Sequence, residues 1–332
     1  MKKIIILFII LTFIFTVFAG CAEKPNSGPD GEQYTKITVV LDWTPNTNHT
    51  GLYVAQEKGY YKDAGLDVQI IQPPEDGALP LLAAGSAQFA VSFQEDIATA
   101  LDAENPLPVI AVSSLLQHNT SGLISLKSKN INTPKDLEGK KYATWDMPLE
   151  KAILKDIITK DGGDYNKLQM IPSTVDDVIA ALNTDIDVVW IYYGWEGIAT
   201  EVNGLDTNFM EFRDLDPVFD YYTPLLAANK DFANKNPDIT KKFLQATKKG
   251  YEYAIENPED AVKILTDKVP EIDQEIAEKS QIYLKNQYVA DGNQWGYIDG
   301  ERWKTFYDWL YENGITSRDL GSEGFTMDYL TE

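Results

Sequence analysis

A regular alternation of short β-branched runs with helix-like stretches constrains the fold more than any other feature of this sequence. The strand-like runs lie at residues 37–41, 66–71, 89–91 and 109–115. Helix-like stretches fill the intervals at 49–58, 78–84 and 95–103. Strands that alternate with helices at this spacing form βαβ units. The first third of the chain therefore predicts a mostly parallel sheet covered by helices.

The pattern starts again in the middle of the chain and then changes. Strand-like runs recur at 124–126, 141–143, 168–171 and 188–191, and from residue 231 onward nearly everything is helical. About 300 residues are more than one hydrophobic core usually serves. We therefore predict an α/β protein with two lobes and a ligand cleft between them. The predicted first lobe comprises 36–123 and 227–332, and the inserted second lobe comprises 124–226.

The N-terminus carries an export signal. Lys2 and Lys3 precede a 15-residue apolar run at 4–18 that only two threonines interrupt, and Ala19, Gly20 and Cys21 follow it. A membrane span needs about 20 apolar residues, so the run is typical of a signal peptide. We predict a signal peptide at 1–20, lipidation of Cys21 and a polar tether at 21–35. The alternative is a single-pass anchor with a chance cysteine. The prediction places the folded part on the extracytoplasmic face of the cell membrane, anchored by lipid.

Charge and residue usage exclude several classes of function. The net charge of −22 argues against nucleic acid and against a strongly anionic ligand. Cys21 is the only cysteine and there are two histidines, which leaves no disulfide framework, no cysteine-based zinc site and no thiol nucleophile. We expect neither a metal site nor a cofactor.

The loop at 41–51, directly after the first strand, is the first candidate for ligand contact. It contains Asp42, Trp43, Asn46 and His49, a set that suits a planar, polar heterocycle. We expect Trp43 and Asn46 to contact the ligand, with Asn48 or Thr47 as the helix N-cap. A lone histidine such as His49 is more often a hydrogen-bonding partner at a helix end than a base.

The second candidate follows the strand at 188–191. Trp190 belongs to the core, whereas Tyr192, Tyr193 and Trp195 flank a glycine turn and are expected to project into the cleft. Glu196 can accept hydrogen bonds from an exocyclic amine and a protonated ring nitrogen. Alternatively, Glu196 only occupies the first turn of a helix, where the dipole favours acidic residues.

A third candidate follows the strand at 89–91. It is the segment Ser92-Phe93-Gln94-Glu95-Asp96. Ser92 and Glu95 have the spacing of a capping box, and the start of this helix also faces the predicted cleft. Tyr222, with Tyr221, lies near the second crossing between lobes and is a weaker candidate, as is Trp145. No hydrolase, phosphate-loop, zinc-protease or calcium motif occurs. The spacing of Trp303, Phe306, Tyr307 and Leu310 predicts a core-facing helix stripe.

The motif at 41–55, with Lys58-Gly59-Tyr60-Tyr61 and Gly65-Leu66-Asp67-Val68, resembles the family of thiamine-pyrimidine-binding proteins. Its ThiY-type branch consists of solute-binding lipoproteins of importers for formylaminopyrimidine, a salvage precursor of thiamin. The resemblance covers most of the chain after Cys21 and implies the type-two periplasmic-binding fold. It also implies ABC permease and ATPase subunits as partners and a monomeric binding protein that is not an enzyme.

One branch of the same family consists of enzymes that form hydroxymethylpyrimidine phosphate from pyridoxal phosphate and a histidine. That branch carries a cysteine-rich iron-binding segment, and this chain lacks those cysteines. Where that branch places reactive lysine and histidine, this chain has Gln94, Glu95, Asp96 and Ile97. The resemblance thus favours a binding protein. The open alternatives are another flat solute, such as hydroxymethylpyrimidine, and the pyrimidine-forming enzyme.

Overall fold

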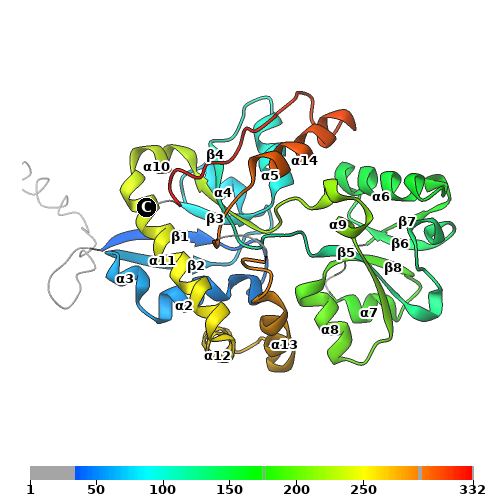
Figure 1. The fold of residues 1–332 in the computed structure, drawn as a ribbon, viewed down its shortest axis with the longest axis horizontal. Helices are drawn as coiled ribbons and strands as arrows, with labels where there is room; N and C mark the ends of the chain where they lie inside the picture. The colour runs from blue at the N-terminus through cyan, green and yellow to red at the C-terminus, as the bar shows by residue number, and fades with distance from the viewer. Residues whose placement is uncertain (1–33, 174, 176, 291–293, 331–332) are drawn as a thin grey trace, which may run out of the picture. The chain divides into compact units, whose positions relative to one another are not determined.

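A computed structural model describes residues 34–173, 175, 177–290 and 294–330. The predicted signal peptide, Cys21 and nearly all of the predicted tether lie outside the described residues. Within the described residues the secondary structure follows the predicted alternation, with strands and helices grouped around two separate sheets (Figure 1).

The first sheet has five strands in the order β2-β1-β3-β10-β4. Their bounds are β1 Thr35–Val40, β2 Leu66–Ile71, β3 Phe89–Ser92, β4 Val109–Ser114 and β10 Leu225–Asn229. Strand β1 pairs with β3 in parallel, with Val39 opposite Phe89. Strand β10 returns from the second sheet and runs antiparallel to both of its neighbours, so that Leu225 lies opposite Ser92 and Ser114.

The second sheet has the order β7-β6-β8-β5-β9. Its strands are β5 Ser121–Leu126, β6 Lys141–Thr144, β7 Gln169–Pro172, β8 Val188–Tyr192 and β9 Thr207–Glu211. Strand β6 pairs in parallel with β7 and β8, whereas β5 is antiparallel to β8 and β9. Each sheet is thus mostly parallel with one reversed strand, the strand by which the chain enters or leaves. The lobe boundaries at residues 124 and 227 stay a prediction. Strands β5 and β10 begin within three residues of these positions.

Helices flank both sheets (Figure 1). The longer ones are α2 Thr50–Glu57, α5 Gln94–Asp102, α6 Pro148–Lys160, α11 Pro237–Glu256, α12 Pro258–Lys268, α13 Gln274–Leu284 and α14 Gly300–Glu312. The shorter ones are α3 Tyr60–Asp63, α4 Leu79–Ala83, α7 Val178–Leu182, α8 Ile198–Val202, α9 Phe212–Leu215 and α10 Lys230–Lys235. Short 3-10 turns lie at η1 Thr47–His49, η2 Lys127–Lys129, η3 Pro134–Leu137, η4 Tyr165–Lys167 and η6 Pro217–Phe219, and a π-helical turn, η5, spans Tyr193–Gly197. In the part of the chain described by the structure, no helix is both long and apolar enough to cross a membrane.

The core follows the period-two alternation of the strands. Val39 packs on the side of the first sheet covered by α2 and α11, whereas its neighbour Val40 packs on the other side with α5 and α14. Successive strand side chains point to opposite faces, so a sheet with helices on both faces needs apolar residues at consecutive positions. The predicted helix stripe, which includes Trp303 and Phe306, is buried in that second layer.

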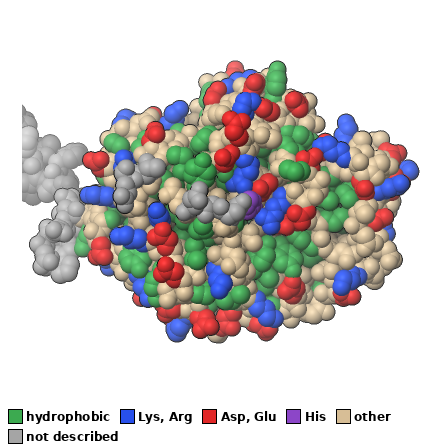
Figure 2. Space-filling model, in the orientation of Figure 1, with side chains coloured by type: hydrophobic (Ala, Val, Ile, Leu, Met, Phe, Trp, Pro, Cys, Tyr) green, Lys and Arg blue, Asp and Glu red, His purple; other side chains and the backbone are tan. Residues whose placement is uncertain are grey.

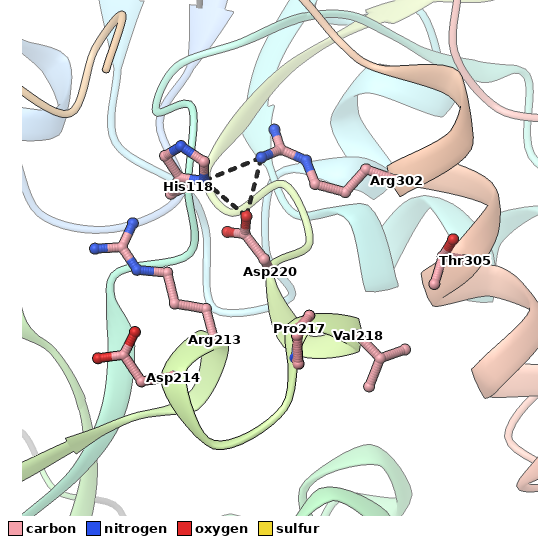
Figure 3. A pocket seen from close by; sticks show the side chains of 8 residues that line it. All are labelled: His118, Arg213, Asp214, Pro217, Val218, Asp220, Arg302 and Thr305. Atoms are coloured by element: carbon pink, nitrogen blue, oxygen red, sulfur yellow. Dashed lines mark hydrogen bonds and ion pairs between the residues drawn. The ribbon is translucent and has the colours of Figure 1, made fainter. Parts of the chain in front are cut away.

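The two segments that connect the sheets lie against each other and against α14. Asp220, in the second connection, accepts a hydrogen bond from the Asn119 N–H at 3.0 Å in the first connection. His118 Nδ1 lies 2.7 Å from the Asp220 carboxylate, and the Arg302 guanidinium lies 3.0 Å from it (Figure 3). His118, Asp220 and Arg302 line a surface cavity of about 580 Å³, to which Arg213 contributes from α9, directly after β9. The contacts tie both connections to the first lobe.

Candidate ligand-binding site

The loop after β1 positions a carboxylate by means of a buried histidine. His49 is fully buried, and its Nε2 lies 2.6 Å from Asp42 Oδ1. The other ring nitrogen, Nδ1, accepts the Asn46 N–H at 3.1 Å, which leaves Nε2 as the nitrogen that carries a proton toward Asp42. His49 therefore orients Asp42 at the carboxyl end of the strand, as a helix-end hydrogen-bonding partner rather than a base.

The N-cap prediction for this loop is wrong by one or two residues. Asn46, not Asn48 or Thr47, caps η1, because its Oδ1 accepts the Asn48 N–H at 2.9 Å. The Asn46 amide nitrogen donates to the Thr44 carbonyl oxygen at 3.2 Å. Both ends of this side chain have partners within their own turn, and a ligand role for Asn46 stays a prediction.

Acidic side chains also follow β3. The predicted capping box of Ser92 and Glu95 is wrong: α5 begins at Gln94, and the residue before it, Phe93, has an extended backbone. Ser92 therefore ends the strand, too far back to cap the helix, and its hydroxyl lies 3.4 Å from the carboxylate of Asp96. Glu95 and Asp96 instead stand side by side in the first turn of α5, where the helix dipole favours negative charge.

The second sheet contributes Glu196 through η5, directly after β8. Its Oε2 accepts the Tyr192 N–H at 3.1 Å. A π-helical turn is uncommon and is found often at functional sites. The Tyr192 ring stacks on Phe93 from the first lobe at 6.2 Å between centroids, and its hydroxyl lies 3.2 Å from the Thr223 hydroxyl. Tyr192 thus joins the two lobes beside Glu196.

Four carboxyl groups interact here, and Asp42, Glu95, Asp96 and Glu196 are called the acid cluster below. Burial raises the pKa of Glu196 from 4.5 to about 7, and the charge of Asp42 adds to the effect. Burial raises the pKa of Asp96 to about 6, and the charge of Asp42 adds to this effect. The pKa of Glu95 is raised well above its usual value by burial and then by Asp96. Desolvation and like charge both disfavour the ionised form, so Glu95, Asp96 and Glu196 keep their protons to a higher pH than exposed carboxyl groups do.

Tyr221 lies beside the acid cluster. Glu95 and Asp96 both raise the pKa of its buried hydroxyl, as burial does more strongly. In return, hydrogen bonding from the Tyr221 hydroxyl acts to lower the pKa of Glu95, against the larger effects of burial and Asp96. Buried polar groups usually have such partners, and the two side chains therefore face each other.

Several predicted side chains lie elsewhere. Tyr193 turns away from the acid cluster: its hydroxyl donates to Glu201 and its ring packs on Phe209 and Tyr283. Tyr222 is fully buried and its hydroxyl accepts the Asp299 N–H at 2.7 Å.

The remaining aromatic candidates are more accessible. Trp195 is half-buried within η5. Trp43 is 53% exposed and Trp145 is 42% exposed, so both leave a ring face free for a flat partner. Each follows a strand, β1 and β6 respectively, at its carboxyl end, where ligands of open α/β sheets bind.

Two residues of the third candidate segment, Phe93 and Asp96, receive no individual role from the sequence. The adjacent pair Glu95-Asp96 right after a buried strand is a visible signal for Asp96. Phe93 has no such signal, because an aromatic residue between a strand and a helix has no distinctive spacing. Among the described residues no group of three or more potential ligands could hold a metal ion.

Comparisons with known proteins identify the family of this chain. Residues 46–261 match the family model described as NMT1/THI5 like. The chain is 30% identical over 317 residues to the formylaminopyrimidine-binding protein of Halalkalibacterium halodurans, which covers 93% of this chain and 94% of that protein. It is 25% identical over 240 residues to the 4-amino-5-hydroxymethyl-2-methylpyrimidine phosphate synthase of Legionella pneumophila, covering 72% of this chain and 75% of the synthase.

Among solved structures, the chain is similar to the alkanesulfonate-binding protein SsuA from Xanthomonas axonopodis pv. citri bound to MOPS. The TM-score is 0.66 at 11% identity, over 88% of this chain and 98% of SsuA. At this identity the likeness concerns the fold alone. It confirms the predicted fold, the two α/β lobes of type-two periplasmic binding proteins.

Proposed function

Since this chain belongs to the NMT1/THI5-like family, we propose that it binds a thiamin pyrimidine precursor, N-formyl-4-amino-5-aminomethyl-2-methylpyrimidine, for thiamin salvage. In this proposal it is the extracytoplasmic, lipid-anchored solute-binding subunit of an ABC importer. Its partners are the permease and the ATPase of that importer. Cys21 carries the lipid, and the protein acts as a monomer.

The observation that carries the proposal is the acid cluster between the lobes. The charges that raise the pKa values of Glu95, Asp96 and Glu196 belong to other carboxylates. A site of this kind favours ligands that donate hydrogen bonds or carry positive charge, and it opposes sulfonates and other anions. An aminopyrimidine has an exocyclic amine and a ring nitrogen that can be protonated, both on one edge of a flat ring.

We assign the polar edge of the pyrimidine to the carboxylates and its faces to aromatic rings. Glu196 would accept from the 4-amino group, with Asp42, Asn46 or Ser92 at the remaining edge and Glu95 beside them. Trp43 and the aromatic residues Tyr192 and Trp195 would cover the ring. His49, Tyr193 and Tyr222 would support the site through their neighbours.

Typical interaction strengths make this assignment reasonable. An aromatic stack contributes about 0.5–1.5 kcal/mol beyond the burial of area, and a hydrogen bond to a charged group contributes about 1.5–3 kcal/mol. Two stacks and two such bonds, with burial of a small ring, reach micromolar to nanomolar affinity, which corresponds to about 8–12 kcal/mol. Contacts from both lobes would favour the closed form, since a ligand shifts the equilibrium toward the state that it binds better.

The pyrimidine-forming enzyme is a less favoured alternative, supported by the similarity to the synthases. The start of α5 bears Gln94, Glu95, Asp96 and Ile97, residues that cannot form a Schiff base with pyridoxal phosphate as a lysine does. Iron and a pyridoxal-phosphate absorbance band in the purified protein would favour the enzyme.

Calorimetric titration of the chain from residue 22 onward tests the proposal. Formylaminopyrimidine, hydroxymethylpyrimidine, thiamin and pyridoxal phosphate are titrated in parallel, with product analysis for turnover. Tight binding of formylaminopyrimidine without turnover is the expected result. Preference for hydroxymethylpyrimidine would change the ligand and keep the class. A lack of heat with both pyrimidines would refute the proposed ligand class.

A further inference from the structure

Helix α13 contacts two of the three segments that position the acid cluster, η1 and η5, although it lies some eighty residues beyond η5 in the chain. Its Ser280 hydroxyl is fully buried and forms hydrogen bonds with the Thr47 hydroxyl of η1 and with the Gly194 carbonyl oxygen of η5. The loop η1 carries His49, which orients Asp42, and η5 carries Glu196. The Ser280 side chain is thus hydrogen-bonded to one loop of each sheet, and the proposed function assigns both loops to the ligand.

The direction of these bonds follows from counting protons. A serine hydroxyl has one proton to donate and two lone pairs with which to accept. A carbonyl oxygen can only accept, so Ser280 donates its proton to Gly194. The Thr47 hydroxyl must then donate to Ser280. The hydrogen bonds form a single chain from η1 through α13 to η5, in which each hydroxyl donates to one acceptor.

The surrounding contacts hold α13 close to both loops. Tyr288, shortly after α13, donates to the Thr47 carbonyl oxygen at 2.6 Å. On the other side, the Tyr283 ring packs on Tyr193 of η5 at 5.4 Å between centroids. Gly194 has no side chain where Leu284 approaches, and a Cβ there would lie 2.8 Å from Leu284 Cδ2. A glycine at this position therefore permits the close approach of helix and turn.

From these contacts we infer that Ser280 is a positioning residue for ligand binding, which fixes η1 and η5 relative to each other. This inference rests on the proposed function, because these loops are the ones assigned to the ligand. Ser280 touches no ligand atom in this assignment. Its removal takes away the hydroxyl that accepts from Thr47 and donates to the Gly194 carbonyl oxygen, so both loops lose a fixed partner.

Ser280→Ala in the full chain tests the inference, with Thr247→Ala as the matched control. Thr247 is also a fully buried hydroxyl, bonded to the Tyr61 hydroxyl at 2.9 Å and to the Phe243 carbonyl oxygen at 2.8 Å, away from both loops. We expect Ser280→Ala to weaken formylaminopyrimidine binding about tenfold, the loss that goes with one unpaired buried group. Hydrogen exchange should become faster in both η1 and η5. The control should lower thermal stability without either change.

Gly194→Ala is a second variant that keeps the Ser280 hydroxyl and pushes α13 away through Leu284. It should reproduce both effects, and the double variant should lose no more affinity than the more affected single variant, because both break the same chain of contacts.

Faster exchange confined to α13, with affinity equal to that of the control, would overturn the inference. Hydrogen exchange needs no ligand, so it decides the coupling between loops even if the wild type binds no pyrimidine. That last outcome would refute the proposed function alone.

Discussion

Glu196→Gln should make the protein more stable and a weaker binder at the same time. Burial and the charge of Asp42 raise the pKa of Glu196 from 4.5 to about 7. One pKa unit corresponds to about 1.4 kcal/mol, so the ionised carboxylate destabilises the folded state by about 3 kcal/mol. Glutamine retains an oxygen that can accept the Tyr192 N–H, and it never ionises.

The sign of the pH dependence follows from proton binding. Below pH 4.5 Glu196 is protonated in both the folded and the unfolded chain and contributes nothing. Between pH 4.5 and about 7 the folded chain keeps the proton that the unfolded chain has lost, so this group lowers stability progressively as pH rises. The free energy of unfolding of Glu196→Gln, relative to wild type, should therefore increase from pH 4.5 to pH 8 by up to about 3 kcal/mol.

Urea unfolding at several pH values, followed by tryptophan fluorescence, measures this difference, and calorimetry measures the affinity. Binding of formylaminopyrimidine should weaken by about 1.5–3 kcal/mol, the value of a hydrogen bond to a charged group. Glu201→Gln is the matched control, since Glu201 is exposed and accepts from the Tyr193 hydroxyl outside the acid cluster. A stability difference that is flat with pH would refute the argument from burial. Unchanged affinity would reduce Glu196 to a helix-end residue.

Three further outcomes are expected. Affinity for the pyrimidine should rise from pH 5 to pH 8, as Glu196 ionises, and then level off. Calorimetry at pH 6.5 in buffers of different ionisation enthalpy should detect the release of a proton on binding. An affinity that falls as pH rises would contradict this prediction. Trp43→Ala should cost about 0.5–1.5 kcal/mol of binding and change stability by less than about 0.5 kcal/mol, because the ring is half exposed; equal affinity would remove Trp43 from the site. Tyr222→Phe should cost about 1–2 kcal/mol of stability by leaving the Asp299 N–H without an acceptor, as urea unfolding would show, while an affinity loss equal to that of Trp43→Ala would restore Tyr222 as a ligand contact.

The sequence predicted the elements better than the orientation of their side chains. Short runs rich in β-branched residues, such as 37–41 and 188–191, favour buried strands over helices, so the two sheets followed from the pattern. The identity of a cap depends on which residue adopts the extended backbone, and neighbouring polar residues compete for that role. Asn46 is the cap, rather than Asn48 or Thr47, because its side chain accepts the Asn48 N–H. The backbone N–H of Asn46 in turn donates to the His49 ring.

The orientation of Tyr193 and Tyr222 could not be predicted for a different reason. Both rings are held by segments distant in the chain: Tyr283 of α13 packs on Tyr193, and the Arg302 guanidinium of α14 lies 4.0 Å from the centroid of the Tyr222 ring. Local sequence places such side chains near the cleft and cannot say which of them face it. The same limit hid Ser280, an ordinary helix serine in the sequence, whose role depends on Thr47 and Gly194.

In the proposed function, the acid cluster distinguishes this chain from sulfonate-binding proteins of the same fold. Scattered surface charges of both signs, such as those over the face in Figure 2, are screened by salt and water and select little. The carboxyl groups of the acid cluster are instead buried beside each other, where charges interact at low dielectric and pKa values are raised. An anion there would meet Asp42 and Glu196 without compensation. A bound amine would reduce the repulsion between the buried carboxylates, so ligand binding would increase the stability of the folded protein.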